Sequence, residues 1–155
     1  MLAAADPVDV AILVARAKLA HVEDREWDMR RDMELVREIF RKVQEKTTLD
    51  YRPIGPIEGY DDFDVGRHVE MLHKAGYIDG FHNKEKLGQP GIVHIYDLSW
   101  DGHEFAGAIL TDEGTWQKMK SAFGPERLAT APLKMIESVA IQAVTAWALS
   151  KMGLN

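Results

Sequence analysis

Cysteine is absent from this chain of 155 residues. Its absence excludes disulfides, thiolate metal sites and cysteine nucleophiles, and it fits a reducing compartment such as the cytoplasm. Positive charge is also scarce, because 19 Lys and Arg residues stand against 25 Asp and Glu, for a formal net charge of −6. A chain with this balance has no overall positive field to attract a phosphate backbone or an anionic membrane. Any contact with nucleic acid would therefore depend on a local cluster of cations.

Long uncharged segments are lacking as well. The apolar segment SVAIQAVTAWALS, residues 138–150, is free of charge for only 13 residues, whereas a helix that spans a membrane needs about 18 or more. Near the N-terminus, Asp6 and Asp9 precede the apolar residues, where a secretory signal would carry basic ones. We therefore predict a cytoplasmic protein without membrane contact.

What is present, 46% hydrophobic and 28% charged residues, is typical of a globular domain of ordinary size. Asp6 followed by Pro7 predicts the start of a first helix that ends near His21. Apolar residues at alternating spacings of four and three predict a second helix over residues 29–46. That stripe consists of Met29, Met33, Val36, Phe40 and Val43.

The segment TTLDYRPIGPIEGYDD, residues 47–62, contains prolines and glycines that exclude a helix and predict an extended loop or short edge strand. A short helix follows, capped by Asp61 or Asp62 and ended by Gly76. Next, YIDGF and GIVHIYDL predict two strands joined by HNKEKLGQP. Ser99 is expected to cap a helix whose Trp100 and Phe105 pack against this hairpin.

The last part of the chain is predicted to be helical. Thr111 or Asp112 caps one helix, which Gly124 and Pro125 are expected to stop, and Pro132 and Gly153 bound the final one. The whole order predicts a mostly helical α+β fold with a winged-helix-like core over residues 29–110. Residues 1–28 would be a helical extension, and residues 111–155 would serve in packing or oligomerisation. The prolines leave no room for the middle helix of a complete winged helix.

The block IEGYDDFDVGRHVEMLHKAGYI, then LSWDGHEFAGAI, WQKMKS and a final helix ending KMGL, resembles an uncharacterised bacterial and prophage family, domain of unknown function 2513. The resemblance covers roughly Met29 to Leu154. The chain departs from the family pattern at Ser99 and Trp100, where a threonine is usual, and at Ala106, where leucine is usual. It also has an additional N-terminal helix. The resemblance implies a winged-helix-like core and a phage or mobile-element context, but no activity.

The helix over residues 61–75 could read DNA if its outward face were cationic. With Val65, Val69 and Leu72 turned inward, helical geometry is expected to turn Arg67, Glu70, Met71 and Lys74 outward. Between residues 61 and 91, four Lys or Arg stand against six Asp or Glu, and aspartates crowd the end of the helix that would meet the bases. The candidate partner or nucleic-acid face comprises Arg67, Glu70, Met71, Lys74, Lys84, Lys86, Arg30, Arg37 and Arg41.

Catalytic and metal-binding motifs are not found in the sequence, which has no nucleophile elbow, no phosphate-binding loop and no dinucleotide fingerprint. We accordingly predict no catalytic residues, no metal and no cofactor. His68 and His73 are five residues apart, so they do not share one side of a helix. A zinc site built from His82, His94 and an acid across the hairpin stays as an alternative.

The final helix is apolar around most of its circumference and must therefore be buried. The first helix, with Ile12, Leu13, Val14 and Leu19, is the expected partner within the chain, and a second subunit is the next. A monomer in which both helices complete one core is the alternative. The candidate residues for self-association are Ile136, Val139, Val144, Trp147 and Leu149.

Together these patterns favour a non-enzymatic, winged-helix-like binding or regulatory module. It would act through a protein partner of unknown identity and through self-association. The first alternative is a transcriptional regulator that contacts DNA through the wing and the helix over residues 29–46. The second is an unrecognised enzyme or metal-dependent protein. A further idea is that the aspartates before residue 65 mimic DNA for some DNA-binding target.

Overall fold

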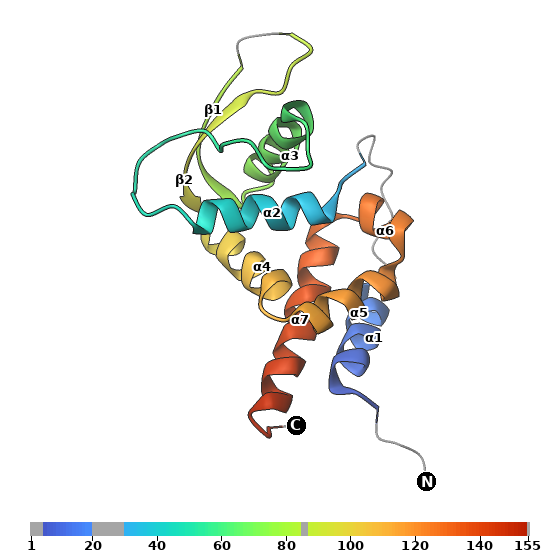
Figure 1. Cartoon of the computed structure of the whole chain (residues 1–155). Coiled ribbons are helices and arrows are strands. Elements are labelled where there is room, and N and C mark those ends of the chain that lie inside the picture. The colour runs from blue at the N-terminus through green and yellow to red at the C-terminus, as the bar shows by residue number, and fades with distance from the viewer. Residues whose placement is uncertain (1–4, 20–29, 85–86, 155) are drawn as a thin grey trace. The chain divides into compact units, whose positions relative to one another are not determined.

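The computed structural model describes residues 5–19, 30–84 and 87–154. Within these ranges it contains seven helices and one two-stranded antiparallel hairpin, so the predicted, mostly helical α+β fold is confirmed (Figure 1). The chain forms two compact units. One consists of residues 1–31 and 107–155, here called the helical unit, and the other of residues 32–106, here called the hairpin unit. The elements are α1 (Pro7–Leu19), α2 (Met33–Gln44), α3 (Asp62–Lys74), β1 (Ile78–Asn83), β2 (Ile92–Leu98), α4 (Trp100–Leu110), α5 (Glu113–Phe123), α6 (Pro125–Thr130) and α7 (Leu133–Lys151).

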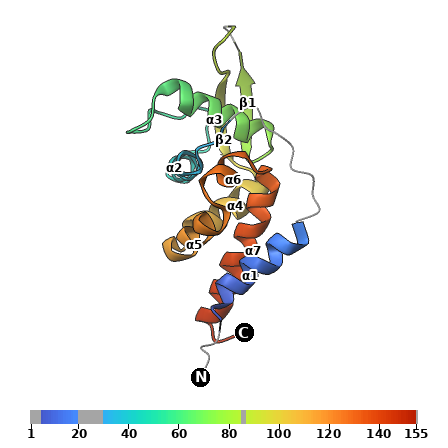
Figure 2. The same ribbon diagram turned by 90° about the vertical axis from the view of Figure 1, so that its right-hand side faces the viewer.

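In the helical unit, α1 lies against α7 (Figure 2). Val8 and Ile12, four residues apart on one side of α1, are buried. Lys118 of α5 forms ion pairs with Asp6 and Asp9 at the start of α1. The prediction that the first helix is the intrachain partner of the last is therefore confirmed, and α7 lies between Pro132 and Gly153 as expected.

Helix α6 was not predicted, because Gly124 and Pro125 were read only as a stop signal. Gly124 does end α5, with a φ of +79° that favours glycine. Pro125 then occupies the first turn of α6, a position where proline is well tolerated because its missing N–H is not needed. The same two residues thus end one helix and begin another.

In the hairpin unit, α2 begins at Met33, later than the predicted residue 29. The reason is Asp32, whose carboxylate accepts hydrogen bonds from the backbone N–H groups of Glu34 and Leu35 and caps the helix. The N–H of Asp32 itself donates to Nε2 of His68 at 2.9 Å, while Nδ1 of His68 lies 2.8 Å from the carbonyl oxygen of Asp64. The neutral imidazole thus joins the start of α2 to α3, and burial, the main cause, lowers the pKa of His68.

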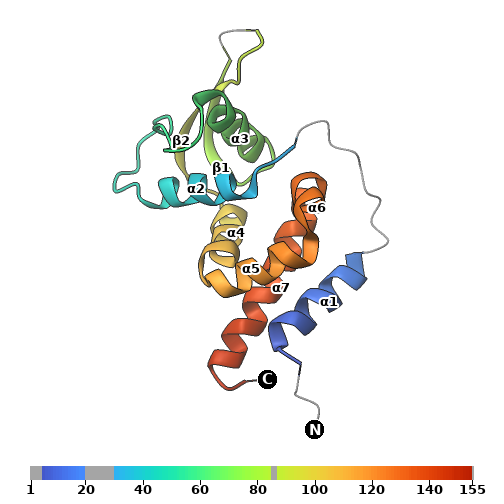
Figure 3. The ribbon, with the colours of Figure 1, turned by 45° about the vertical axis from the view of Figure 1, so that its right-hand side comes forward.

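The next elements follow the predicted signals. Asp61 caps α3, and Gly76, with a φ of +88°, follows its end. β1 pairs with β2 so that Phe81 lies opposite His94, and α3 packs beside this hairpin (Figure 3). On the other edge of β2, Arg52 forms a single isolated bridge with Ile95, and no strand lies between α2 and α3, so of the two predicted forms the extended loop is the one observed.

The core of this unit contains an aromatic cluster. Phe105 of α4 packs edge-on against Phe40 and Tyr77, with ring centroids 5.6 and 5.2 Å apart. The expectation that Trp100 packs against the hairpin together with Phe105 is wrong for Trp100, because its side chain is 79% exposed and its indole N–H donates to Glu104 at 3.0 Å. Residues five apart on a helix point about 140° from each other, so both cannot face one core.

Candidate functional site

A groove of about 700 Å³ opens in the hairpin unit between residues 53–56, the first half of α3 and the start of β2. It is called the β2 groove below. Its walls are mostly apolar, with Ile54, Phe63 and Ile92 among them, and Asp62 is the single charged residue of the described ones that line it. Its volume lies in the range of roughly 300 to 1000 Å³ that is usual for ligand pockets.

Two prolines shape one wall of the β2 groove. After the bridge between Arg52 and Ile95, the fixed φ of Pro53 and Pro56 keeps the segment out of a helix, and the described residues form no further bridge to this edge of β2. On the opposite wall, Gly66 lets Pro90 approach α3, since a Cβ added at residue 66 would lie 3.3 Å from the Pro90 ring. The groove is therefore a consequence of proline and glycine positions visible in the sequence.

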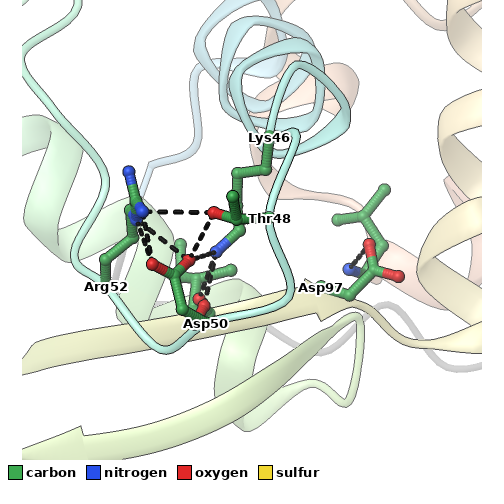
Figure 4. Close-up of polar contacts among 7 residues, drawn as sticks. Lys46, Thr48, Asp50, Arg52 and Asp97 are labelled. Carbon is green, nitrogen blue, oxygen red and sulfur yellow. Dashed lines mark hydrogen bonds and ion pairs between the residues drawn. The ribbon is translucent and has the colours of Figure 1, made fainter.

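The segment that leads into this wall is held by a cluster of polar groups around Asp50 (Figure 4). Nε of Arg52 donates to both carboxylate oxygens of Asp50, at 3.0 and 3.1 Å, and the Thr48 hydroxyl donates at 2.9 Å. Lys46 Nζ donates to the carbonyl oxygens of Asp50 at 2.6 Å and of Ile95 at 2.9 Å. The hydrogen bonds from Arg52, and then from Thr48, hold the pKa of Asp50 well below its usual value.

Glu70 of α3 holds Gly91, on the opposite wall of the β2 groove, in place. Its buried carboxylate accepts a hydrogen bond from the N–H of Gly91 at 2.8 Å and forms an ion pair with Lys74 at 2.9 Å. Nε2 of His82 lies 3.2 Å from the same carboxylate. Burial alone would raise the pKa of Glu70, but the hydrogen bonds from Lys74 and Gly91 outweigh it and lower the pKa. The expectation that Glu70 faces outward is wrong, because Glu70 is buried and its carboxylate is bonded to Gly91, just before β2.

The remaining residues of the proposed α3 face differ in how far they are exposed to solvent. Arg67 and Met71 are half-buried, and Lys74 is exposed but paired with Glu70. Helical spacing placed these side chains outward relative to Val65, but it could not reveal that the hairpin covers part of the same side. The structure therefore does not bring the four α3 residues together as one exposed face.

The arginines proposed for the helix over residues 29–46 also have acidic partners. Arg37, expected on the solvated side, is buried and pairs with Glu34 at 2.9 Å, and Arg41 pairs with Glu38. Arg30 pairs with Glu126 in the helical unit at 2.5 Å. In the hairpin loop Lys84 is exposed, whereas Lys86 lies outside the described residues.

An aromatic surface on the hairpin was missed by the sequence reasoning. Tyr51 packs on Phe81 and Tyr96, with ring centroids 5.5 and 5.0 Å apart, and Phe81 stacks on His94 at 4.5 Å. Tyr51 and Phe81 are nevertheless 56% and 50% exposed. The sequence does contain a signal for this surface, because Ile92, His94 and Tyr96 alternate along GIVHIYDL and so share one face of the strand.

The proposed self-association residues are mostly engaged within the helical unit. Ile136 and Val139 are fully buried, and Val144 and Trp147 are half-buried, which leaves Leu149 as the exposed member. The exposed apolar stripe lies instead on α1, where a set of residues at helical spacings of three and four faces away from the buried side. That stripe consists of Val10, Leu13 and Val14.

Neither a metal site nor a membrane span is found in the part of the chain that the structure describes. No group of three or more His, Asp or Glu side chains there could hold a metal ion. His94 stacks on Phe81, while His82 lies beside Glu70, so these two histidines have different neighbours. No described helix combines the length and apolar character needed to cross a bilayer.

Comparison with known proteins gives one finding. The model of a family described as "Hypothetical protein (DUF2513)" matches residues 30–126, a range that runs from before α2 into α6. It includes all of the residues that line the β2 groove. No curated protein and no solved structure matches the chain.

Proposed function

The chain belongs to the DUF2513 family, and we propose that it is a non-enzymatic, winged-helix-like module that binds a protein partner through the β2 groove. The observation that carries this proposal is the concentration of exposed apolar side chains in and beside the groove. Phe63 and Ile92 on its walls are 47% and 46% exposed. Apolar side chains gathered in this way are typical of surfaces that bind other proteins.

The winged-helix-like part of the proposal is supported by the order of the elements. A helix, a bridged edge segment, a second helix and a hairpin follow one another, and the bridge places residue 52 on the opposite edge of β2 from β1. Helix α3, the second helix in this order, presents Asp62 and Phe63 to the groove. These side chains suit an apolar partner with some positive charge and would repel a phosphate backbone.

Regulation through DNA contact is the less favoured alternative. Nonspecific affinity for DNA comes from neutralising phosphates, roughly six to ten of them in a strong binder. Arg37, Arg41 and Lys74 already form ion pairs with neighbouring carboxylates, so each would have to break such a pair to reach a phosphate. The paired cations therefore support protein binding over DNA binding.

Site-specific photo-crosslinking tests the proposal in cells that naturally express the chain. A photoreactive phenylalanine analogue replaces Phe63 in the groove or, as the matched control, the more exposed Trp100 outside it. We expect a discrete protein adduct from position 63 and none of that mass from position 100. Equal labelling from both positions would refute a groove-specific partner. Recovery of nucleic acid, together with salt-sensitive DNA binding that Lys84→Glu abolishes, would replace the proposal by the DNA alternative.

We also propose that the helical unit binds a second copy of the chain through α1. Val10, Leu13 and Val14 form an exposed apolar stripe, and Leu13 is 65% exposed. Light scattering of the whole chain should show a dimer that Leu13→Glu dissociates. Leu87→Glu, at an even more exposed loop position in the hairpin unit, should leave the dimer intact. A monomer of 17.5 kDa at every concentration would contradict this proposal.

A further inference from the structure

The β2 groove offers a ligand apolar side chains but few main-chain hydrogen-bond donors. Residues 53–56 are Pro-Ile-Gly-Pro, so this wall has N–H groups only at two adjacent residues. In an extended segment, adjacent N–H groups point to opposite sides, so at most one of them faces the groove. On the other side, Pro90 also lacks an N–H, and the N–H of Gly91 is bonded to Glu70 at 2.8 Å. Val93 is only 3% exposed, so its main-chain groups are not accessible to a ligand.

A protein segment that is buried in this groove must therefore satisfy most of its own backbone groups. An extended peptide cannot do so, because its N–H and C=O groups need partners on another chain. An α-helix bonds these groups to one another within the same segment. Amphipathic helices bind apolar grooves in this way, through side chains at spacings of three, four and seven residues.

The charge of the ligand follows from the rim of the groove beside α3. Residues 53–66 contain four carboxylates, at Glu58, Asp61, Asp62 and Asp64, and no Lys, Arg or His. Glu58, Asp61 and Asp62 are exposed, and none of the three forms an ion pair within the described part of the chain. A helix with Lys or Arg next to its apolar side would pair with these carboxylates, whereas an acidic helix would be repelled.

We propose that the β2 groove binds an amphipathic helix of a partner protein. The apolar side of this helix packs against Ile54, Phe63 and Ile92, and a lysine or arginine lies beside Asp62. The apolar side chains supply the affinity, and the carboxylates on the rim select a basic helix over an acidic one. This inference rests on the proposed protein-binding function and names the class of ligand.

A library of random peptides, each about four helical turns long, displayed on phage, tests the inference on the full chain. The enriched sequences should place apolar residues at spacings of three and four and carry Lys or Arg. Phe63→Asp should abolish binding, whereas Trp100→Asp, at a more exposed position outside the groove, should not change it. Apolar residues at every second position, or binding that survives Phe63→Asp, would overturn the proposal.

A pair of matched variants tests the contact with the acidic rim. Asp62→Asn should weaken binding of an enriched peptide several-fold, because the ion pair is lost. Asp79→Asn removes an exposed carboxylate of β1 that does not line the groove, and it should have little effect. Added salt should weaken binding to the unchanged chain more than binding to Asp62→Asn. Equal binding by the two variants would refute the basic contact.

Proline substitution in the synthetic peptides then tests the helix, without any change to the protein. Proline in the middle of the peptide, at a position outside its apolar stripe, should weaken binding about a hundredfold, because it breaks the helix. Proline at the first residue should have little effect, because a helix does not use the N–H there. In NMR spectra of an isotope-labelled peptide, the chemical shifts of the backbone should become helical on binding.

The outcomes separate this inference from the function on which it rests. Peptides that accept proline at every position, or whose bound chemical shifts are those of an extended chain, would refute the helical ligand, while a protein adduct at position 63 would still support a protein partner. Absence of both the adduct and the enriched peptides would overturn the two together. An adduct at position 63 formed only with a second copy of the chain would refute a separate partner protein.

Discussion

Gly102, in the first turn of α4, provides a direct test of how the hairpin unit is packed. A Cβ added at this residue would lie 2.0 Å from the carbonyl oxygen of Tyr77 and 3.2 Å from Cβ of Leu98. The Tyr77 carbonyl also accepts the N–H of Ser99 at 3.0 Å. The backbone at Tyr77 therefore cannot move away from an alanine at position 102 without losing the bond that positions the start of α4.

The expected cost of Gly102→Ala follows from two opposing effects. Forcing an extra carbon into a packed site costs about 3 kcal/mol, at the upper end of the usual range because the atom it meets is backbone. Alanine recovers about 1 kcal/mol through its higher helix propensity. The free energy of unfolding should therefore fall by about 2 kcal/mol. Gly107→Ala in the same helix meets no atom within 4 Å, so it should gain about 0.5 to 1 kcal/mol.

Urea unfolding of the two variants and the unchanged chain, followed by circular dichroism, measures both effects. The midpoint should move to lower urea for Gly102→Ala and to higher urea for Gly107→Ala. Because the same substitution is made in one helix, helix propensity cannot explain opposite signs. A neutral or stabilising Gly102→Ala would show that α4 does not approach the Tyr77 backbone as described.

Three further predictions concern the polar groups that hold the hairpin unit. Burial lowers the pKa of His68, so the folded state favours the neutral imidazole. The contribution of His68 to the free energy of unfolding is therefore complete above about pH 6.5 and declines as the pH falls below that value. An NMR titration that gives an ordinary or raised pKa for His68 would contradict this. The pKa of Glu70 is lowered, so its ionised carboxylate stabilises the fold above about pH 4.5, and this contribution is lost as the pH falls below that value. Glu70→Gln should therefore flatten the acid part of the plot of unfolding free energy against pH. An unchanged plot would contradict the role of the buried carboxylate. Asp50→Asn removes the charge that holds Arg52, so amide exchange at Ile95 should become faster; equal exchange in both chains would show that the bridge does not depend on Asp50.

Much of the fold could be predicted from the sequence because its signals are local. Asp61 and Ser99 cap helices through bonds to residues three positions away, and Gly76 ends a helix through its own positive φ. The hairpin follows from two short apolar runs separated by polar and glycine residues. Each of these signals depends on neighbouring residues, so the packing of the whole chain is not needed to read it.

The orientation of charged side chains could not be predicted in the same way. Glu70 is buried because Gly91, 21 residues later, donates its N–H to the carboxylate. Helical spacing shows which residues share a side of α3, but not how far the hairpin wraps around it. Long-range polar partners of this kind leave no periodic pattern in the sequence. The start of α2 was missed for a different reason, because its signal is the local cap that Asp32 forms with the N–H groups of Glu34 and Leu35.

Pro53 links what the sequence excluded to what the structure offers for binding. In the sequence, Pro53 excluded a helix after residue 47, and with it the middle helix of a complete DNA-binding winged helix. In the structure, the same residue lines the β2 groove, directly after the bridge between Arg52 and Ile95. The fixed φ of proline accounts for both observations, because it keeps residues 53–56 out of a helix and holds them extended along the groove. The missing helix and this wall of the groove therefore have one cause.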